Sequence, residues 1–299
     1  MQAFGTHATR TIMSRSFLFV PADSERKLDK ARDGNADALI IDLEDSVAAS
    51  ARPAARKSAV AFISGDAPMP LWVRINPLGT PEALLDLEAV MAVAPDGIVL
   101  PKCGGSADIL SLGKLLHTLE VENGVPVGRT QIMPLVTERP AALFHMGEYA
   151  TCPERLAGLT WGAEDLSAAL GATANRAADG SWLAPYELAR SLCLLAASAA
   201  GVAAVDTVFT SFKDDDGLAR YAAAARRDGF SGMLAIHPAQ VGIINDAFTP
   251  SAEERARAER IVALFETNPD AGALALDGEM LDRPHLVQAR RILEHSGKP

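Results

Sequence analysis

Short apolar runs rich in β-branched residues alternate with segments of helical length along most of the chain. Such alternation predicts a parallel sheet built from βα units. Eight runs are expected to be strands: Ser16–Val20, Ala38–Asp42, Leu71–Ile75, Gly97–Leu100, Gln131–Val136, Leu156–Trp161, Ala204–Thr207 and Gly232–Ala235. The segments expected to be helices between them are Ser24–Asp33, Ala54–Ile63, Pro81–Val93, Ser106–Glu120, Pro140–Ala150, Pro185–Ala200 and Asp214–Arg227.

Eight strands with helical crossovers fit a closed (β/α)₈ barrel, the TIM barrel of the α/β class, better than an open sheet. We expect the barrel in residues 16–250, a disordered tail in residues 1–15, and a C-terminal helical extension and lid in residues 251–299. Ser251 is the expected N-cap of a helix in this extension, and Pro284–His295 is its expected last helix. The spacing GxGxxG of dinucleotide-binding loops is missing after Gly104-Gly105.

Composition excludes several classes of partner. The formal net charge is −10, which argues against a nucleic-acid binder. The longest apolar run, Leu192 to Val205, is too short to span a bilayer, so no membrane partner is expected. The three cysteines have no CxxC spacing, which suits a reducing cytoplasm and predicts neither a disulfide framework nor a zinc site.

Polar residues cluster where the expected strands end. The carboxyl ends of barrel strands converge on one mouth, where catalytic groups are found. Seven strand ends carry charged or titratable groups there: Asp42-Leu43-Glu44-Asp45, Arg74, Pro101-Lys102, Glu138-Arg139, Glu164-Asp165, Asp206 and His237. Loop Gly171–Ala184 interrupts the sixth unit and is long enough to border this mouth.

Several carboxylates without cysteine or paired histidine suit a hard cation, Mg²⁺ or Mn²⁺. Glu138 and Asp165 are the expected metal ligands, and the alternative is that they form buried ion pairs with Arg139 or Lys102. Ion pairing or support of the site is expected of the acidic residues after the second strand, Asp42, Glu44 and Asp45.

Two cations at the strand ends are candidates for substrate binding. Arg74 lies in an apolar strand, where an unpaired charge is costly, so it should clamp a substrate carboxylate, pair with Glu44, or do both. Lys102 could form a Schiff base if its pKa were lowered, but neighbouring acids favour a charged lysine that neutralises them. His237 is expected to be a hydrogen-bonding core histidine outside the site.

An ordered set of motifs extends along nearly the whole chain after Arg15. The motifs are Arg15-Ser16-Phe17-Leu18-Phe19-Val20-Pro21, Arg26-Lys27-Leu28, Ile41-Asp42-Leu43-Glu44-Asp45-Ser46-Val47, Val73-Arg74-Ile75-Asn76-Pro77, Leu100-Pro101-Lys102, Gly158-Leu159-Thr160-Trp161-Gly162-Ala163-Glu164-Asp165-Leu166, Ala235-Ile236-His237-Pro238-Ala239-Gln240 and Asp277-Gly278-Glu279-Met280-Leu281-Asp282-Arg283-Pro284. In this order the motifs resemble those of citrate lyase β-subunit-like proteins of the HpcH/HpaI aldolase superfamily.

The resemblance implies a homotrimeric TIM barrel with Mg²⁺ on Glu138 and Asp165 and a keto-acid carboxylate on Arg74. Asp282 resembles the acid that malyl-CoA lyases carry on a lid over a neighbouring subunit's site, and its alternative role is to cap the last helix. Catalytic roles are therefore expected for Asp282, Arg74, Glu44 and Lys102, with Arg74 and Lys102 also binding substrate.

One motif departs from the family. Many members carry Ile-Glu-Thr-Ala at the metal glutamate, whereas this chain reads Val136-Thr137-Glu138-Arg139-Pro140. Counting forward to Tyr149-Ala150 keeps Glu138 in register, so the ligand survives while its surroundings change.

The expected activity is reversible cleavage of a 3-hydroxyacyl-CoA, such as malyl-CoA or citramalyl-CoA, into acetyl-CoA and a 2-keto acid. Three alternatives stay open. The chain could be a citrate lyase β-subunit acting on an acyl-carrier-protein thioester, a malyl-CoA thioesterase, or a non-catalytic subunit.

Overall fold

A closed parallel barrel forms the larger part of the computed structural model, which describes residues 14–152 and 155–295. The strand order is β5-β4-β3-β2-β1-β8-β7-β6, and bridges from Ile132 to Leu156 and from Leu135 to Thr160 join β5 to β6. The strands are β1 (Ser16–Pro21), β2 (Ala38–Asp42), β3 (Leu71–Arg74), β4 (Gly97–Leu100), β5 (Gln131–Pro134), β6 (Gly158–Thr160), β7 (Ala203–Asp206) and β8 (Gly232–Ala235). The expected (β/α)₈ barrel is confirmed.

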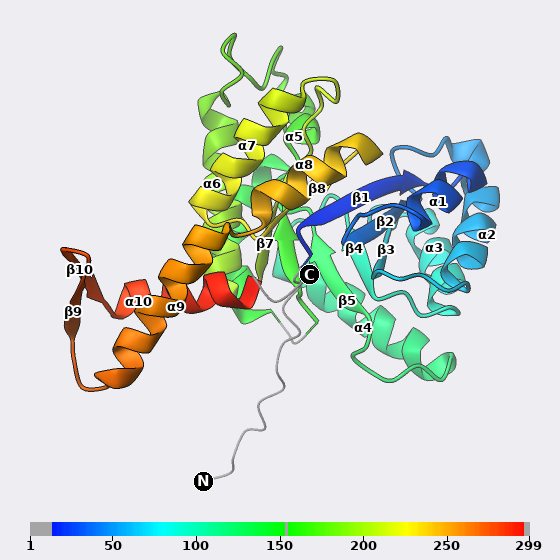
Figure 1. Ribbon diagram of the computed structural model, residues 1–299. Helices are drawn as coiled ribbons and strands as arrows, with labels where there is room; N and C mark the ends of the chain where they lie inside the picture. The colour runs from blue at the N-terminus through cyan, green and yellow to red at the C-terminus, as the bar shows by residue number, and fades with distance from the viewer. Residues whose placement is uncertain (1–13, 153–154, 296–299) are drawn as a thin grey trace. The chain divides into compact units, whose positions relative to one another are not determined.

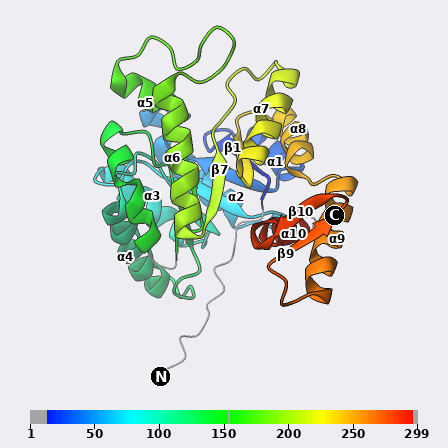
Figure 2. The ribbon, with the colours of Figure 1, turned by 90° about the vertical axis from the view of Figure 1, so that its left-hand side faces the viewer.

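Helices follow the strands and lie outside their ring (Figures 1 and 2). They are α1 (Glu25–Arg32), η1 (Ala49–Ala51), α2 (Arg52–Ile63), α3 (Pro81–Met91), α4 (Ser106–Glu122), η2 (Pro140–Thr151), α5 (Ala163–Leu170), α6 (Ala184–Ala200), α7 (Asp215–Asp228) and α8 (Pro238–Phe248). Among the described residues, no helix combines the length and apolarity needed to cross a membrane.

The segment after β5 is a 3₁₀ helix, η2, where the sequence predicted a helix without distinguishing its type. Its buried residues Ala142, Met146 and Tyr149 recur every three or four positions, a spacing that both helix types produce. The hydrophobic pattern therefore locates this helix without deciding its hydrogen bonding.

The chain divides into two compact units, Met1–Asn245 and Asp246–Pro299. In the second unit, α9 (Ala252–Thr267) begins with a capping box in which Ser251 and Glu254 satisfy each other's backbone amides. A hairpin of β9 (Ala273–Leu276) and β10 (Glu279–Asp282) and the helix α10 (Arg283–His295) follow. Ala258, Ile261, Phe265, Leu281, Leu286 and Ala289 form the apolar core of this unit.

We expected helices in this extension and did not predict the hairpin. The sequence nevertheless contains a signal for its turn. Asp277 and Gly278 form the two-residue turn, with φ of 53° and 84°. Asp-Gly is a preferred pair for such turns because both central residues need positive φ. The strands flanking it, four residues each, are too short to show a clear alternating pattern.

Most of the expected tail, residues 1–13, lies outside the described residues. The two residues that follow belong to the barrel unit. Ser14 is buried, and the Arg15 guanidinium bonds the Asp37 carboxylate with Nε 2.8 Å from Oδ2.

Side chains pointing into the barrel form its core. Phe17, Ile40, Trp72, Val99 and Met133 are buried there, and the rings of Phe17 and Trp72 meet edge to face at 6.3 Å. The register pairs Trp72 with Gly97 of β4, so both residues face the same side of the sheet. A Cβ at Gly97 would lie 2.1 Å from the Trp72 ring, which means that the glycine makes room for the indole.

Replacing Gly97 with alanine should therefore destabilise the barrel. The added methyl group overpacks a full interior, a change that costs about 1–3 kcal/mol in well-packed cores. Urea denaturation of Gly97→Ala measures the effect. The matched control is Gly113→Ala on α4, where the nearest atom lies 3.9 Å from the new Cβ and alanine favours the helix. Equal stability of the two variants would contradict this packing.

Candidate active site

Arg74 and Asp42 form an ion pair at the carboxyl ends of the strands. The parallel register of β2 and β3 places these two residues side by side. Arg74 donates from Nε to Asp42 Oδ1 at 2.7 Å and from Nη2 to Oδ2 at 2.6 Å. Burial alone would raise the pKa of Asp42, but the hydrogen bonds and charge of Arg74 outweigh it and hold that pKa below 3.8.

The remaining nitrogen of Arg74 faces two further carboxylates. Nη1 lies 3.2 Å from Glu44 Oε2 and 3.4 Å from Asp45 Oδ2. The alternative of a salt bridge between Arg74 and Glu44 is thus confirmed, while the substrate clamp stays a prediction. Burial raises the pKa of Glu44 above 4.5, although both neighbouring cations oppose that rise.

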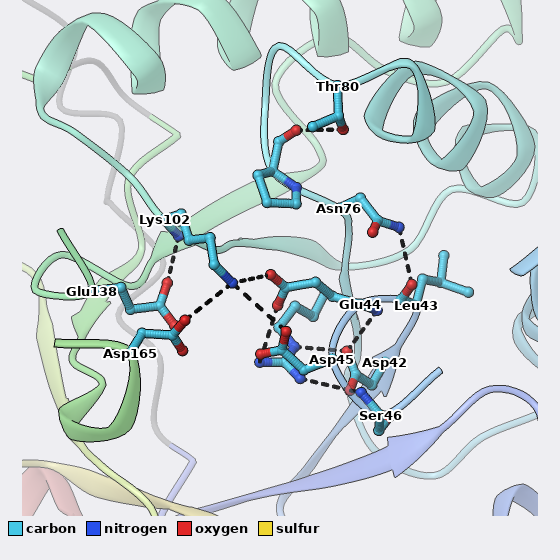
Figure 3. Close-up of polar contacts among 12 residues, drawn as sticks. Asp42, Leu43, Glu44, Asp45, Ser46, Asn76, Thr80, Lys102, Glu138 and Asp165 are labelled. Atoms are coloured by element: carbon cyan, nitrogen blue, oxygen red, sulfur yellow. Dashed lines mark hydrogen bonds and ion pairs between the residues drawn. The ribbon is translucent and has the colours of Figure 1, made fainter. Parts of the chain in front are cut away.

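Lys102 links the acids after β2 to those after β5 and β6. Its Nζ lies 2.6 Å from Glu44 Oε1, 3.4 Å from Asp165 Oδ1 and 3.7 Å from Asp45 Oδ1 (Figure 3). Burial would lower the lysine pKa, but the carboxylates, Glu44 first, raise it above its ordinary value. A charged ammonium is a poor Schiff-base nucleophile, so the geometry favours the neutralising role.

The backbone at Lys102 serves the site as well. Its φ of 52° is in the left-handed region, which is uncommon for a residue with a side chain. In this conformation the Lys102 amide donates to Glu138 Oε2 at 2.5 Å while the side chain reaches Glu44. Lys102 therefore contacts Glu138 through its backbone and Glu44 through its side chain, and it does so in a strained conformation.

Glu138 and Asp165 lie side by side across from Glu44 (Figure 3). Glu138 follows β5 and is 4% exposed, whereas Asp165 stands in the first turn of α5 and is partly open. Burial, together with the charges of Asp165 and Glu44, raises the pKa of Glu138 to about 8 despite the Lys102 amide. This buried carboxyl group therefore holds a proton near neutral pH unless a different cation binds to it in place of the proton.

Two cavities meet at this carboxylate pair. The mouth cavity, about 260 Å³, contains Arg74 and has apolar walls that include Phe19, Leu135 and Leu234. The loop cavity, about 510 Å³, is lined by the loops after β3, β4 and β5 and by α5, and it contains Lys102 and Arg139. Both cavities include Glu138 and Asp165.

Two of the groups predicted at the strand ends, Asp206 and His237, make contacts outside this cluster of acids and cations. Asp206 is fully buried and accepts hydrogen bonds from Trp161 Nε1 at 2.6 Å, Arg190 Nη2 at 2.8 Å and Tyr221 Oη at 3.1 Å. The prediction of a core histidine at position 237 is wrong. His237 is exposed and stacks on the Phe212 ring at 5.6 Å, because β8 ends two residues earlier at Ala235.

Two supporting residues were missed in the sequence. Asn76 donates from Nδ2 to the Leu43 carbonyl at 3.0 Å and to Asp86 Oδ2 at 2.7 Å. Asp86 is fully buried and also binds Arg56 Nε at 2.6 Å. These bonds tie the loops after β2 and β3 together. Asn76 could have been recognised as a polar residue that follows a buried strand. Asp86 could not, because in the sequence it resembles any acidic residue on a helix.

The long loop between α5 and α6 reaches the rim of the mouth cavity. Asn175 donates to Glu164 Oε1 at 2.9 Å, and Glu164 lines that cavity. The Arg176 guanidinium lies 3.4 Å from the centre of the Trp182 ring, which holds the two sides of the loop together.

Asp282 belongs to the second unit. It ends β10, and its Oδ1 lies 2.5 Å from Nδ1 of His285 in the first turn of α10. The catalytic role expected for Asp282 stays a prediction.

A TIM barrel with buried acids and paired cations at its strand ends has the architecture of a β/α-barrel enzyme. The chain belongs to the HpcH/HpaI aldolase/citrate lyase family, whose sequence profile matches residues 15–238. The family assignment made from the motifs is confirmed.

Relatives are similar over nearly their whole length. The chain is 35% identical over 285 residues to a citrate lyase subunit beta-like protein of Mycobacterium tuberculosis, covering 94% of this chain and 95% of the relative. It is 34% identical over 290 residues to a (3S)-malyl-CoA thioesterase of Cereibacter sphaeroides, covering 93% of each. The structure of CitE from M. tuberculosis with magnesium, acetoacetate and coenzyme A matches with a TM-score of 0.80 and 34% identity, over 97% of this chain and 100% of that one.

The raised pKa of Glu138 predicts how stability depends on pH and on a divalent cation. A carboxyl with a raised pKa binds its proton more tightly in the folded state, so folding weakens as pH rises from about 4.5 to about 8. We expect metal-free wild type to lose stability relative to Glu138→Gln over this range. Mg²⁺ should restore more stability above pH 8 than near pH 5, because it competes with the proton. Thermal unfolding measures both effects, and parallel pH profiles of the two proteins would contradict the assignment.

Gly162 makes room for the Glu138 carboxylate. A Cβ at this position would lie 3.1 Å from Glu138 Cγ and 3.3 Å from Oε1. If Glu138 holds Mg²⁺ as predicted, Gly162→Ala should displace that carboxylate and weaken Mg²⁺ binding about 10–100-fold, the usual effect of disturbing the support of a metal ligand. Calorimetric titration with Mg²⁺ measures this effect. Gly147→Ala, where no atom lies within 4 Å of the new Cβ, is the control and should bind like wild type.

Proposed function

We propose that this protein is a Mg²⁺-dependent carbon–carbon lyase. It cleaves, and in reverse condenses, a 3-hydroxyacyl-CoA such as malyl-CoA or citramalyl-CoA, with acetyl-CoA and a 2-keto acid as products. The observation that carries this proposal is the pair of carboxylates from the buried Glu138 and the partly exposed Asp165, which both line the two cavities. Membership of the aldolase/citrate lyase family supports the reaction class.

The donor set fits Mg²⁺. Among the residues that the structure describes, no cluster of three His, Cys, Asp or Glu side chains forms a complete metal site. Two carboxylates are nevertheless what Mg²⁺ commonly takes from a protein, with waters and substrate oxygens as the other ligands. Glu138 and Asp165 would hold the ion, which when bound acts as a Lewis acid toward the substrate oxygens. The related CitE structure was obtained with magnesium, acetoacetate and coenzyme A.

The two cavities suit the two halves of such a substrate. The mouth cavity is small, has apolar walls and contains Arg74, which fits a short keto acid whose carboxylate faces a guanidinium. The loop cavity is about twice as large and suits the thioester arm. The bond that breaks then lies beside Glu138 and Asp165.

Cleavage requires the hydroxyl group of the substrate to lose its proton. The bond between the hydroxyl-bearing carbon and the carbon next to the thioester then breaks, and its electron pair forms the thioester enolate. Glu44 is the group we assign to take the proton, because burial raises its pKa and its Oε2 lies 3.2 Å from Nη1 of Arg74, which lines the mouth cavity. Lys102, bonded to the other oxygen of Glu44, stabilises the carboxylate before transfer.

The enolate then takes a proton at carbon, which completes acetyl-CoA. Asp282 is the acid we assign to this step, and in condensation it removes the same proton. Its place beside His285 at the end of a short hairpin is compatible with a lid group. By the family expectation, that lid closes over the site of a neighbouring subunit in a homotrimer.

A second candidate function is hydrolysis of malyl-CoA. The observation that favours it is the (3S)-malyl-CoA thioesterase of C. sphaeroides, 34% identical to this chain. The two activities differ in products, because hydrolysis releases free thiol and malate, whereas cleavage releases a keto acid and leaves the thioester intact.

Product analysis with malyl-CoA and citramalyl-CoA tests both functions. Keto acid, detected as its hydrazone, should appear with Mg²⁺ and disappear with EDTA, and Glu138→Gln and Asp165→Asn should lower the rate at least about 100-fold if they hold the ion. Asp23→Asn, an exposed residue that lines neither cavity, is the control and should keep wild-type activity. Thiol without keto acid would establish the thioesterase instead. Turnover of neither ester would redirect the search to a carrier-protein thioester.

A further inference from the structure

Arg139 lines the loop cavity beside Glu138, the predicted metal ligand. It stands directly after Glu138 as the N-cap of η2, and its side chain is exposed and lines the loop cavity. The guanidinium lies against the backbone at Gly104, where an added Cβ would be 3.3 Å from Nη1. A side chain at position 104 would push Arg139 away from this place.

The other cations of the two cavities already have partners. Arg74 contacts Asp42, Glu44 and Asp45 with its three nitrogens, and Lys102 contacts Glu44, Asp45 and Asp165. The Arg139 guanidinium makes no ion pair or hydrogen bond with any residue in 14–152 and 155–295, although the Arg139 carbonyl accepts from the Ala142 amide at 2.9 Å. An anion that enters the loop cavity therefore meets Arg139 as its available cation.

Backbone amides near Arg139 do not compete for such an anion. At the start of α4, Asp108 accepts from the Gly104 amide at 2.7 Å, and Glu148 accepts from the Ser106 hydroxyl at 2.8 Å and from the Ser106 amide at 3.3 Å. These carboxylates cap the helix and repel anions there. Asp108 also lines the loop cavity, so Arg139 supplies the positive charge on this side of it.

We propose that Arg139 binds a second anionic group of the substrate, distinct from the carboxylate that faces Arg74. The proposal rests on the assignment of the loop cavity to the thioester half. The group is a carboxylate or a phosphate, both of which match the planar fork of an arginine. It comes either from a second carboxylate on the acid or from a phosphate of the CoA carrier.

Equilibrium binding tests this proposal without requiring turnover. CoA, oxaloacetate and pyruvate are titrated by calorimetry, with Mg²⁺ present, into wild type, Arg139→Gln and Arg139→Lys. Arg220→Gln, which makes the same charge change at an exposed site lining neither cavity, is the control. Thermal unfolding establishes that each variant is folded.

Arg139→Gln should weaken binding about tenfold or more for one anion-rich ligand, since hydrogen bonds to charged groups contribute that much. Pyruvate should bind as in wild type, and Arg139→Lys should recover part of the loss. A loss for CoA assigns the carrier phosphate, and a loss for oxaloacetate assigns a second carboxylate. Equal affinities of all variants for all three ligands would overturn the proposal.

Steady-state kinetics separate this proposal from the proposed function. In the condensation of acetyl-CoA with each keto acid, Arg139→Gln should raise KM for the ligand it binds and leave kcat near wild type. A wild-type protein without lyase activity but with an Arg139-dependent affinity would refute the function and retain the anion site. An active lyase with unchanged KM in Arg139→Gln would retain the function and refute the site.

Discussion

An excess of negative charge at the carboxyl ends of β2 to β6 determines the electrostatic properties of the candidate active site. Five carboxylates, from Asp42, Glu44, Asp45, Glu138 and Asp165, surround two cations, Arg74 and Lys102. In a partly buried site each unmatched negative charge is costly. The imbalance is relieved at Glu138, whose pKa rises to about 8, and a divalent cation would relieve it further. The same excess of negative charge raises the pKa of Lys102 and favours its charged form.

The barrel is what makes such a concentration of charge tolerable. Parallel register aligns Asp42 with Arg74, and Asn76 with Asp86 ties the following loops together. Below these residues the barrel interior is filled by Trp72, for which Gly97 makes room. Burial of this apolar layer holds the polar groups in place, so the site keeps its geometry although its charges repel one another.

Much of the fold could be predicted because its signals are local. Each strand is a short apolar run, and the described strands begin and end within two residues of the expected limits. The capping box of α9 could be recognised from Ser251 and Glu254, which are three positions apart. The hairpin of the second unit was not predicted because its strands are too short to show an alternating pattern. The 3₁₀ type of η2 was not predicted because the spacing of apolar residues does not reveal the hydrogen-bond pattern of a helix.

The sequence by itself determined the barrel, the family and the identity of the charged groups at its mouth, because strand periodicity and ordered motifs depend on residues close together in the chain. Only the tertiary structure decided which charges meet. Arg74 pairs with Asp42, and Lys102 lies between Glu44 and Asp165. His237 is exposed, and the guanidinium of Arg139 has no partner among the described residues. These outcomes depend on register, burial and distances of a few ångströms between segments far apart in the chain, which no local pattern encodes.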